Sequence, residues 1–226
     1  MKNSTSFDFF KQFPLFNVLS EDEMNQLFHL VEFKKVKKYD YIYKISEPSK
    51  EVYFLVKGIV KIGRHSDDGR EVIKSILHPM AMFGELPLMG EAHRQDYAVA
   101  MNEEVHIYTL KVTDFQRLIA TNHQLCIAIM NYVGQRLRDV ENRLEDLVFK
   151  DARARIIDFI KESAEKRGRR VGFEMLFKHC LTQQDIANIT GTSRQTVTSV
   201  LNELKRSDLI YFNRRSILIR DMAKLA

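Results

Sequence analysis

The sequence predicts an α+β protein with three parts: an N-terminal antiparallel β-barrel of the jelly-roll type, a long dimerisation helix and a C-terminal winged helix-turn-helix. Short apolar runs with strand periodicity recur between residues 33 and 110. A charged helical stretch follows, in which apolar residues repeat every three or four positions. Near the end, a turn that contains glycine joins two short helices, and a hairpin follows them. The predicted domains are 1–120, 121–149 and 150–226.

Composition sets the broad class. The chain has 226 residues, of which 45% are hydrophobic, enough for one large or two modest cores. Cys126 and Cys180 lie far apart, which indicates free thiols in a reducing compartment rather than a disulfide. No apolar run approaches the ~18 residues of a membrane span, and the first residues do not resemble a signal peptide. We therefore expect a cytoplasmic protein with no membrane partner.

The positive charge is concentrated at the C-terminal end. Residues 150–226 carry 16 Lys and Arg against 9 Asp and Glu, whereas the whole chain has a net charge of +5. The rest of the chain is therefore slightly acidic. Neutralising phosphates requires basic residues on the nucleic-acid-binding domain, so this distribution supports DNA as a partner.

The N-terminal residues 7–30 are expected to be helical, because Ser20 and Glu23 form a capping box before apolar residues at helical spacing. The β-rich region follows. Its expected strands are 39–43, 52–56, 59–62, 72–77, 97–100 and 105–110, and Asp68-Gly69 is typical of a hairpin turn.

The segment 82–90, Met-Phe-Gly-Glu-Leu-Pro-Leu-Met-Gly, interrupts the strand pattern. Gly84 would let the backbone approach a small polar ligand closely, and Glu85 would supply a carboxylate beside it. An ordinary corner of the barrel explains the same residues, and the short motif alone favours that interpretation.

The helical region from about 113 to 148 begins with a short helix, and its second, long helix has a narrow apolar stripe at spacings of three and four. Packing on the chain's own barrel is one explanation. Because charged residues flank the stripe, a partner helix is favoured, and a second copy of the chain is the simplest partner. The predicted dimer interface is Met130, Val133, Leu137, Val140, Leu144 and Leu147.

The C-terminal region is predicted to contain a hinge at 149–152, a helix at 152–167 and a helix-turn-helix from Leu181 to Leu201. Thr182 and Asp185 cap its first helix, and Gly191 ends it. A buried two-helix corner would show the same pattern. The basic charge and the hairpin around Arg214 and Arg215 favour a winged DNA-binding domain, in which the hairpin tip contacts phosphates.

Together these parts resemble the CRP/FNR family of bacterial transcription regulators. The resemblance rests on Phe83-Gly-Glu-Leu86, the turn Val56-Lys-Gly58, and the stretches from Leu181 and from Ser193. It implies a cyclic-nucleotide-binding-like barrel and a dimeric, sequence-specific DNA-binding regulator controlled at the barrel by a small-molecule or a redox or gas signal. Double-stranded DNA and, by the family resemblance, RNA polymerase would be its partners.

The resemblance also implies ligand contacts, and the chain departs from the family pattern there. The implied ligand residues are Gly84, Glu85, Leu86, Arg94, Gln95, Val140 and Glu141. Cyclic-AMP binders have Arg-Ser at Arg94-Gln95 and adjacent Thr and Ser at Val140-Glu141, so a cyclic nucleotide is allowed but not favoured. An iron–sulfur cluster is excluded because no cysteine precedes Cys126. Haem is disfavoured because the histidines are scattered, and no metal site is expected.

For the DNA-reading helix, Arg194 matches the family's guanine reader. Gln195 replaces a glutamate that accepts from cytosine, and Ser199 replaces a second base-reading arginine, so the preferred operator should differ. The full set of predicted DNA contacts is Thr182, Gln183, Ser193, Arg194, Gln195, Thr196, Thr198, Ser199, Arg214 and Arg215.

Two other function classes are weighed against this one. A ligand-binding regulatory subunit that acts through protein partners is opposed by the basic C-terminal region. An enzyme is opposed by the lack of a catalytic triad pattern or a phosphate-binding loop. The acid pairs Asp67-Asp68 and Glu103-Glu104 are interpreted as solvated turns.

Overall fold

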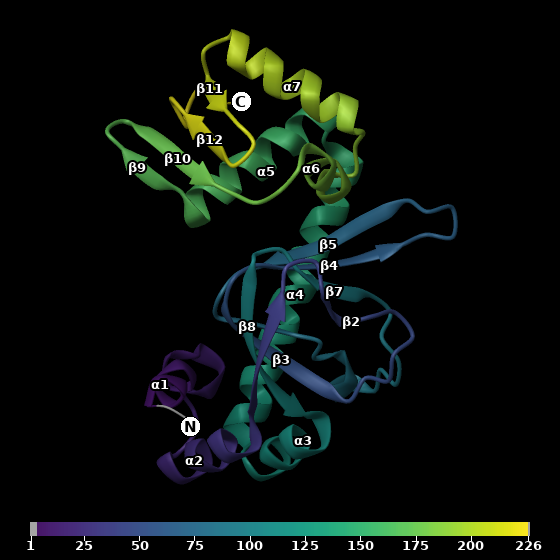
Figure 1. Ribbon diagram of the computed structural model, residues 1–226, viewed down its shortest axis with the longest axis vertical. Coiled ribbons are helices and arrows are strands. Elements are labelled where there is room, and N and C mark those ends of the chain that lie inside the picture. Colours follow the sequence, from purple (N-terminus) through teal and green to yellow (C-terminus); the bar gives the residue numbers. More distant parts are fainter. Residues whose placement is uncertain (1–3, 226) are drawn as a thin grey trace. The chain divides into compact units, whose positions relative to one another are not determined.

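The computed structural model describes residues 4–225 (Figure 1). The chain forms two compact units. The first contains the residues up to Arg64 together with Lys74–Asp139, and the second contains His65–Ile73 together with the residues from Val140 onward.

The N-terminal helices pack an aromatic cluster onto the first sheet. They are α1 (Ser4–Gln12), a 3-10 turn η1 (Pro14–Phe16) and α2 (Glu21–Leu30). The helical prediction for this region is confirmed, with a break at Phe13 where a proline follows. The capping box is also present, since the Glu23 N–H donates to Ser20 Oγ (3.3 Å) and the Ser20 N–H to the Glu23 carboxylate (2.8 Å). The Phe10 and Phe13 rings contact the Phe54 ring edge-on, and their centroids lie 5.6 and 5.4 Å from the Phe54 centroid.

Two four-stranded antiparallel sheets make up the β-rich region. One has the order β1 (Glu32–Lys37), β8 (Glu104–Lys111), β3 (Glu51–Lys57) and β6 (Ala81–Phe83). The other has the order β2 (Tyr41–Tyr43), β7 (Tyr97–Ala100), β4 (Val60–His65) and β5 (Glu71–Leu77).

The jelly-roll prediction is confirmed, but the two sheets form a sandwich and do not close into a barrel. Within residues 4–225, each outer strand of a sheet has a hydrogen-bonded neighbour on one side only, so neither sheet closes on itself. Side chains from the two inner faces fill the space between the sheets, including those of Leu55, Ile62, Phe83 and Ile107. The Asp68-Gly69 turn is confirmed: Gly69 has φ 82°, and the Ser66 N–H donates to the Arg70 carbonyl at 2.8 Å.

The segment that interrupts the strands forms a 3-10 turn, η2 (Leu86–Met89), between Gly84 (φ 65°) and Gly90 (φ 98°). Two further helices follow the sandwich, α3 (Val112–Thr121) and the long α4 (His123–Phe149). The short-then-long helix prediction is therefore confirmed.

The C-terminal part of the second unit combines three helices with a third sheet. The helices are α5 (Ala152–Arg167), α6 (Gln183–Thr190) and α7 (Arg194–Arg206). The sheet has the order β11 (Ile210–Phe212), β12 (Ser216–Ile219), β10 (Glu174–Lys178) and β9 (Arg169–Val171). The predicted wing corresponds to β11 and β12, and the β9–β10 hairpin extends the same sheet by two strands.

Candidate DNA-binding surface and N-terminal ligand site

The first helix of the helix-turn-helix is fixed at both ends by its own residues. Thr182 Oγ1 accepts from the Asp185 N–H (3.0 Å), and the Asp185 carboxylate accepts from the Thr182 N–H (2.8 Å). Gly191 caps the other end with φ 63°, and its N–H donates to the Ala187 carbonyl. These contacts satisfy backbone groups that a short helix would otherwise leave unpaired, and they set the angle at which α7 begins.

The second helix, α7, separates a buried face from an exposed face. Ser193 caps its start, because the Thr196 N–H donates to Ser193 Oγ at 3.0 Å. The buried face consists of Val197, Val200, Leu201 and Leu204, each at most 5% exposed. Arg194, Gln195 and Ser199 are exposed on the other side. This division leaves polar side chains free to reach base edges in a major groove.

The remaining predicted DNA residues fall into two groups. Thr182, Ser193 and Thr196 take part in the helix caps, so their hydroxyls already have partners within the chain. Thr198 Oγ1 donates to Gln183 Oε1 (2.7 Å), which ties α7 to the first residue of α6. Because its oxygen is used in that contact, Gln183 retains its amide N–H groups as donors.

The wing tip holds two exposed arginines on an ordered turn. Asn213 Oδ1 accepts from the N–H groups of Arg215 (2.8 Å) and Ser216 (2.9 Å). Arg214 and Arg215 are exposed beside that turn. Across residues 4–225, no carboxylate forms an ion pair with either arginine or with Arg194. All three therefore remain available to phosphates or bases.

Arg155 is a functional candidate that sequence reasoning missed. Its Nε donates to the Thr190 carbonyl (2.9 Å) and its Nη2 to the Gly191 carbonyl (3.2 Å), while its Nη1 donates to the Lys150 carbonyl (2.6 Å). One guanidinium thus connects the residue after α4 with the turn of the helix-turn-helix. The partners of Arg155 are backbone carbonyls, which no sequence pattern reveals.

The predicted dimer residues lie mostly exposed on α4. Met130, Leu137, Val140, Leu144 and Leu147 are between 53 and 67% exposed, and Val133 is partly buried against the cluster that contains Phe10 and Phe54. Phe149, at the end of the helix, is 82% exposed. A row of exposed apolar side chains on one helix indicates a surface that another molecule covers.

At the N-terminal site, Gly84, Glu85 and Arg94 lie together, and the arginine is only 2% exposed. Arg94 donates through Nη1 to the Gly84 carbonyl (2.9 Å) and through Nη2 to the Glu51 carbonyl. Its guanidinium lies 4.4 Å from the Tyr43 ring centroid and 5.6 Å from that of Tyr53. The Arg94 guanidinium therefore already contacts two backbone carbonyls and two aromatic rings within the chain.

Glu85 is buried, 3% exposed, and forms an ion pair with Arg136 of α4. Burial raises the pKa of Glu85, and the neighbouring Arg136 charge opposes that rise. Tyr132, one turn before Arg136, donates its hydroxyl to the Met82 carbonyl at 2.6 Å. Two α4 side chains therefore hold the segment around Gly84, and neither was among the predicted ligand residues.

Close packing around Gly84 disfavours a cyclic nucleotide in this arrangement. A Cβ at Gly84 would lie 2.9 Å from the Tyr53 ring and 3.0 Å from Arg94 Nη1, so the chain's own side chains fill the space beside this glycine. Arg94 uses one N–H of Nη1 and one of Nη2 for the two carbonyls, and its buried Nε has no partner within residues 4–225, so a cyclic phosphate would compete with those carbonyls for this guanidinium.

The other predicted ligand residues lie outside this cluster of contacts. Leu86 is 44% exposed, and Gln95 is exposed with its side-chain amide donating to the His93 carbonyl (3.2 Å). Val140 and Glu141 are exposed on α4, where Val140 belongs to the apolar row described above. On α4, the contact with Glu85 comes instead from Arg136, one turn before Val140.

Neither a metal centre nor a membrane span is indicated in the part of the chain that the structure describes. Across residues 4–225, no group of three or more His, Cys, Asp or Glu side chains could hold a metal ion. Within the same range, no helix has both the length and the apolar character needed to cross a bilayer.

Two family models match the chain in the order of its domains. Residues 33–122 match the cyclic nucleotide-binding domain, and residues 154–226 match the Crp-like helix-turn-helix domain. The N-terminal match covers the sandwich, and the C-terminal match covers α6, α7 and the wing.

Relatives and solved structures agree with these matches. The chain is 32% identical over 180 residues, 80% of each protein, to the CRP-like cAMP-activated global transcriptional regulator of Mycobacterium tuberculosis. It is 26% identical over 174 residues, 76% of this chain and 78% of the relative, to the global nitrogen regulator of Synechococcus elongatus. FixK2 from Bradyrhizobium japonicum shares the fold, with a TM-score of 0.76 at 23% identity over 86% of this chain and 95% of that one. A CRP-family transcriptional regulator from Thermus thermophilus superposes with a TM-score of 0.70 at 26% identity, covering 85% and 94%.

Proposed function

Since the chain belongs to the CRP/FNR family of transcription regulators, we propose that it acts as a homodimer that reads a two-fold operator with α7. DNA-binding transcription regulation is the function that its matched domains and its relatives have in common. The additional claims are the dimer, the residues that contact DNA and the way in which a signal reaches them.

The two-sided character of α7 is the observation that carries this proposal. Its apolar face is buried at Val197, Val200 and Leu201, which fixes the helix on the domain. Its first turn carries Arg194 and Gln195 on the exposed side. Residues at the N-terminal end of a recognition helix are those that contact base edges.

The side chains of α7 define an operator preference. Arg194 can donate to both O6 and N7 of a guanine. Gln195 favours an adenine in place of the cytosine that a glutamate would select. Ser199 is too short to act as a second guanine reader, so the base opposite it is specified weakly. The wing arginines Arg214 and Arg215 position the domain through phosphates.

Dimerisation through α4 brings two copies of α7 to the two half-sites. The support is the exposed apolar row from Met130 to Leu147, whose spacing suits a parallel two-helix contact. A two-fold dimer of this kind binds half-sites about one helical turn apart on DNA.

The N-terminal sandwich is proposed as the sensor, responding to a small-molecule or a redox or gas signal. The Glu85–Arg136 ion pair supports a route from the sandwich to α4, because any ligand near Gly84 would meet that pair. A signal can shift DNA affinity only if it binds two conformations of the dimer with different affinity. RNA polymerase is proposed as the protein partner on the basis of the family alone.

The decisive experiment measures operator choice. The operator is first selected from random duplexes, and affinity for it and for random DNA is then measured for the wild type, Arg194→Ala and Arg206→Ala. Arg194→Ala should lose about 1–3 kcal/mol of specific binding while random binding changes little. Arg206 is the control because it is exposed in the last turn of the same helix. Equal specific affinity in the wild type and Arg194→Ala would refute the assigned reading helix.

A second measurement tests DNA as the partner class. Binding to random duplex DNA should weaken steeply with salt, because basic side chains release counterions from the phosphates. A flat salt dependence would favour the alternative of a regulatory subunit that acts through proteins.

A further inference from the structure

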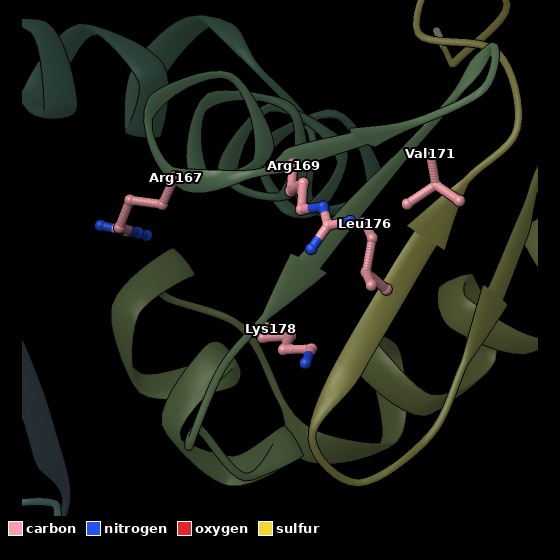
Figure 2. Close-up of a pocket in the computed structure, with 5 residues that line it drawn as sticks. All are labelled: Arg167, Arg169, Val171, Leu176 and Lys178. Atoms are coloured by element: carbon pink, nitrogen blue, oxygen red, sulfur yellow. The ribbon is translucent and has the colours of Figure 1, made fainter.

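A pocket of about 320 Å³ lies on the β9–β10 hairpin, in the DNA-binding unit but outside the residues assigned to DNA (Figure 2). Its lining comes from the end of α5 and from both strands of the hairpin: Arg167, Arg169, Val171, Leu176 and Lys178. Three of these five residues are cationic, two are apolar and none is acidic.

The strand register brings two of the cations onto one face. Arg169 and Leu176 are directly paired across β9 and β10, and Figure 2 shows their side chains next to each other. Lys178 lies two residues beyond Leu176, so it points to the same face of the sheet. A diagonal pair of this kind is separated by about 7–8 Å, within which two long side chains can reach one anion. Arg167 points away from the other four in Figure 2 and forms the rim.

The two central cations have no acidic partner. Across residues 4–225, no carboxylate forms an ion pair with Arg169 or Lys178, and the nearby Glu174 is paired with Arg220 at 3.9 Å. Two cations held on one face repel each other, and an anion bound between them would remove that repulsion. The charge pattern therefore favours a negatively charged occupant.

The shape and the apolar floor narrow the class of ligand. Leu176 is partly buried, and Val171 is 45% exposed at the edge of the sheet. Apolar contacts of this kind favour a ligand that carries hydrocarbon beside its charge. The volume is at the lower end of the range for small-molecule sites, about 300–1,000 Å³.

The position of the pocket argues against operator DNA as the occupant. In the sheet order β11-β12-β10-β9, the pocket lies on the two strands at the end opposite β11. The α7 helix packs against β11, at the other edge. We propose that the pocket binds a small organic anion, with its carboxylate, sulfonate or phosphate group between Arg169 and Lys178 and its apolar part on Leu176 and Val171. It is a second ligand site, distinct from the one in the sandwich.

Phenyl phosphate is a suitable probe because it combines a dianion with one apolar ring. Its binding to the full-length protein is measured by saturation-transfer difference NMR, with inorganic phosphate and benzyl alcohol as comparators. We expect saturable binding of phenyl phosphate with a Kd of roughly 0.1–1 mM, as is typical of a ligand with about ten heavy atoms. Each comparator should bind at least about fivefold more weakly, because each lacks one of the two kinds of contact.

Variants locate the site. Arg169→Ser and Lys178→Ser should each weaken phenyl phosphate binding roughly tenfold, because each removes one charge-assisted hydrogen bond. Arg170→Ser is the matched control, since Arg170 is the next residue of the same edge strand and points to the opposite face. It should bind within about twofold of the wild type.

Four results would overturn the proposal: the absence of saturable binding, equal binding by Arg169→Ser, Lys178→Ser and the wild type, equal binding of inorganic phosphate and phenyl phosphate, and displacement of the probe by random duplex DNA with a parallel loss of operator affinity in both variants. The last result would assign the cations to DNA. The test is independent of the reading helix, because Arg194→Ala should bind phenyl phosphate as the wild type does.

Discussion

Removal of Arg136 should destabilise the N-terminal unit by about 2–4 kcal/mol. The change leaves the Glu85 carboxylate, which is 3% exposed, without its ion-pair partner Arg136. Breaking a buried ion pair by deleting one partner typically costs about 3–5 kcal/mol, because the remaining charge is left without compensation. The Arg136 side chain is 34% exposed, so water screens the pair in part and lowers the expected cost to about 2–4 kcal/mol.

The assay is urea unfolding of Arg136→Met at neutral pH, followed by circular dichroism. Arg138→Met is the matched control. Arg138 is exposed two residues after Arg136 on α4, and its guanidinium donates to Gln135 of the same helix. The control should stay within about 0.5 kcal/mol of the wild type. A double-mutant cycle with Glu85→Gln should give a coupling energy of about 2 kcal/mol, since the neutral amide no longer needs the arginine.

The protonation state of Glu85 gives an independent readout. Burial already raises the pKa of this carboxyl, and Arg136 opposes the rise. In Arg136→Met the opposing charge is absent, so the pKa should rise further, which a carboxyl-carbon NMR titration would detect. If Arg136→Met unfolds like Arg138→Met and the Glu85 pKa is unchanged, the ion pair does not fasten α4 to the segment around Gly84.

Three further predictions test the second unit and the dimer. Leu137→Asp, at a position 58% exposed on α4, should give monomers in analytical ultracentrifugation, whereas Val72→Asp, at a position 59% exposed in β5, should leave the dimer intact. Gly191→Ala should cost about 1–2 kcal/mol in urea unfolding, since φ is 63° and Leu147 lies 3.0 Å from the added Cβ, and Gly191→Asn should cost less because asparagine tolerates that conformation. Burial lowers the pKa of His179 below its usual 6.5, so the folded state binds fewer protons than the unfolded state between the two pKa values. Stability of the second unit should therefore fall as the pH drops below about 6.5, and His179→Gln should flatten that dependence.

The sequence predicted elements well where the local chemistry decides the conformation. Examples are the capping boxes at Ser20 and Thr182 and the positive φ of Gly191. Each involves residues no more than a few positions apart, so the local sequence is enough to predict it. The long helix and the wing also follow from periodicity alone.

The elements that were missed have their partners far away in the sequence. Strand β1 (Glu32–Lys37) is mostly charged and half exposed, and it is a strand because β8 pairs with it. Strands β6 and β9 have three residues each, too few for a period-two pattern. Whether the sheets close into a barrel depends on which outer strands meet, and apolar periodicity carries no information on that point.

The candidate ligand site shows the same division. Gly84, Glu85 and Arg94 were identified from a motif and do lie together, yet their partners Tyr43, Tyr53 and Arg136 were not identified. A motif records which residues can bind a ligand, but the surrounding aromatic rings determine whether space remains for one.

In this chain the motif residues already have internal partners, and that changes what a signal must do. A ligand that entered beside Gly84 would have to compete with the Gly84 and Glu51 carbonyls for Arg94, and with Glu85 for Arg136. Its net binding energy would then be the difference between the new contacts and those it displaces. Because the displaced Arg136 is on α4, the exchange would alter the attachment of the helix that carries the exposed apolar row. The Glu85–Arg136 pair is therefore the contact through which a ligand beside Gly84 would act on the position of α4 in the proposed dimer.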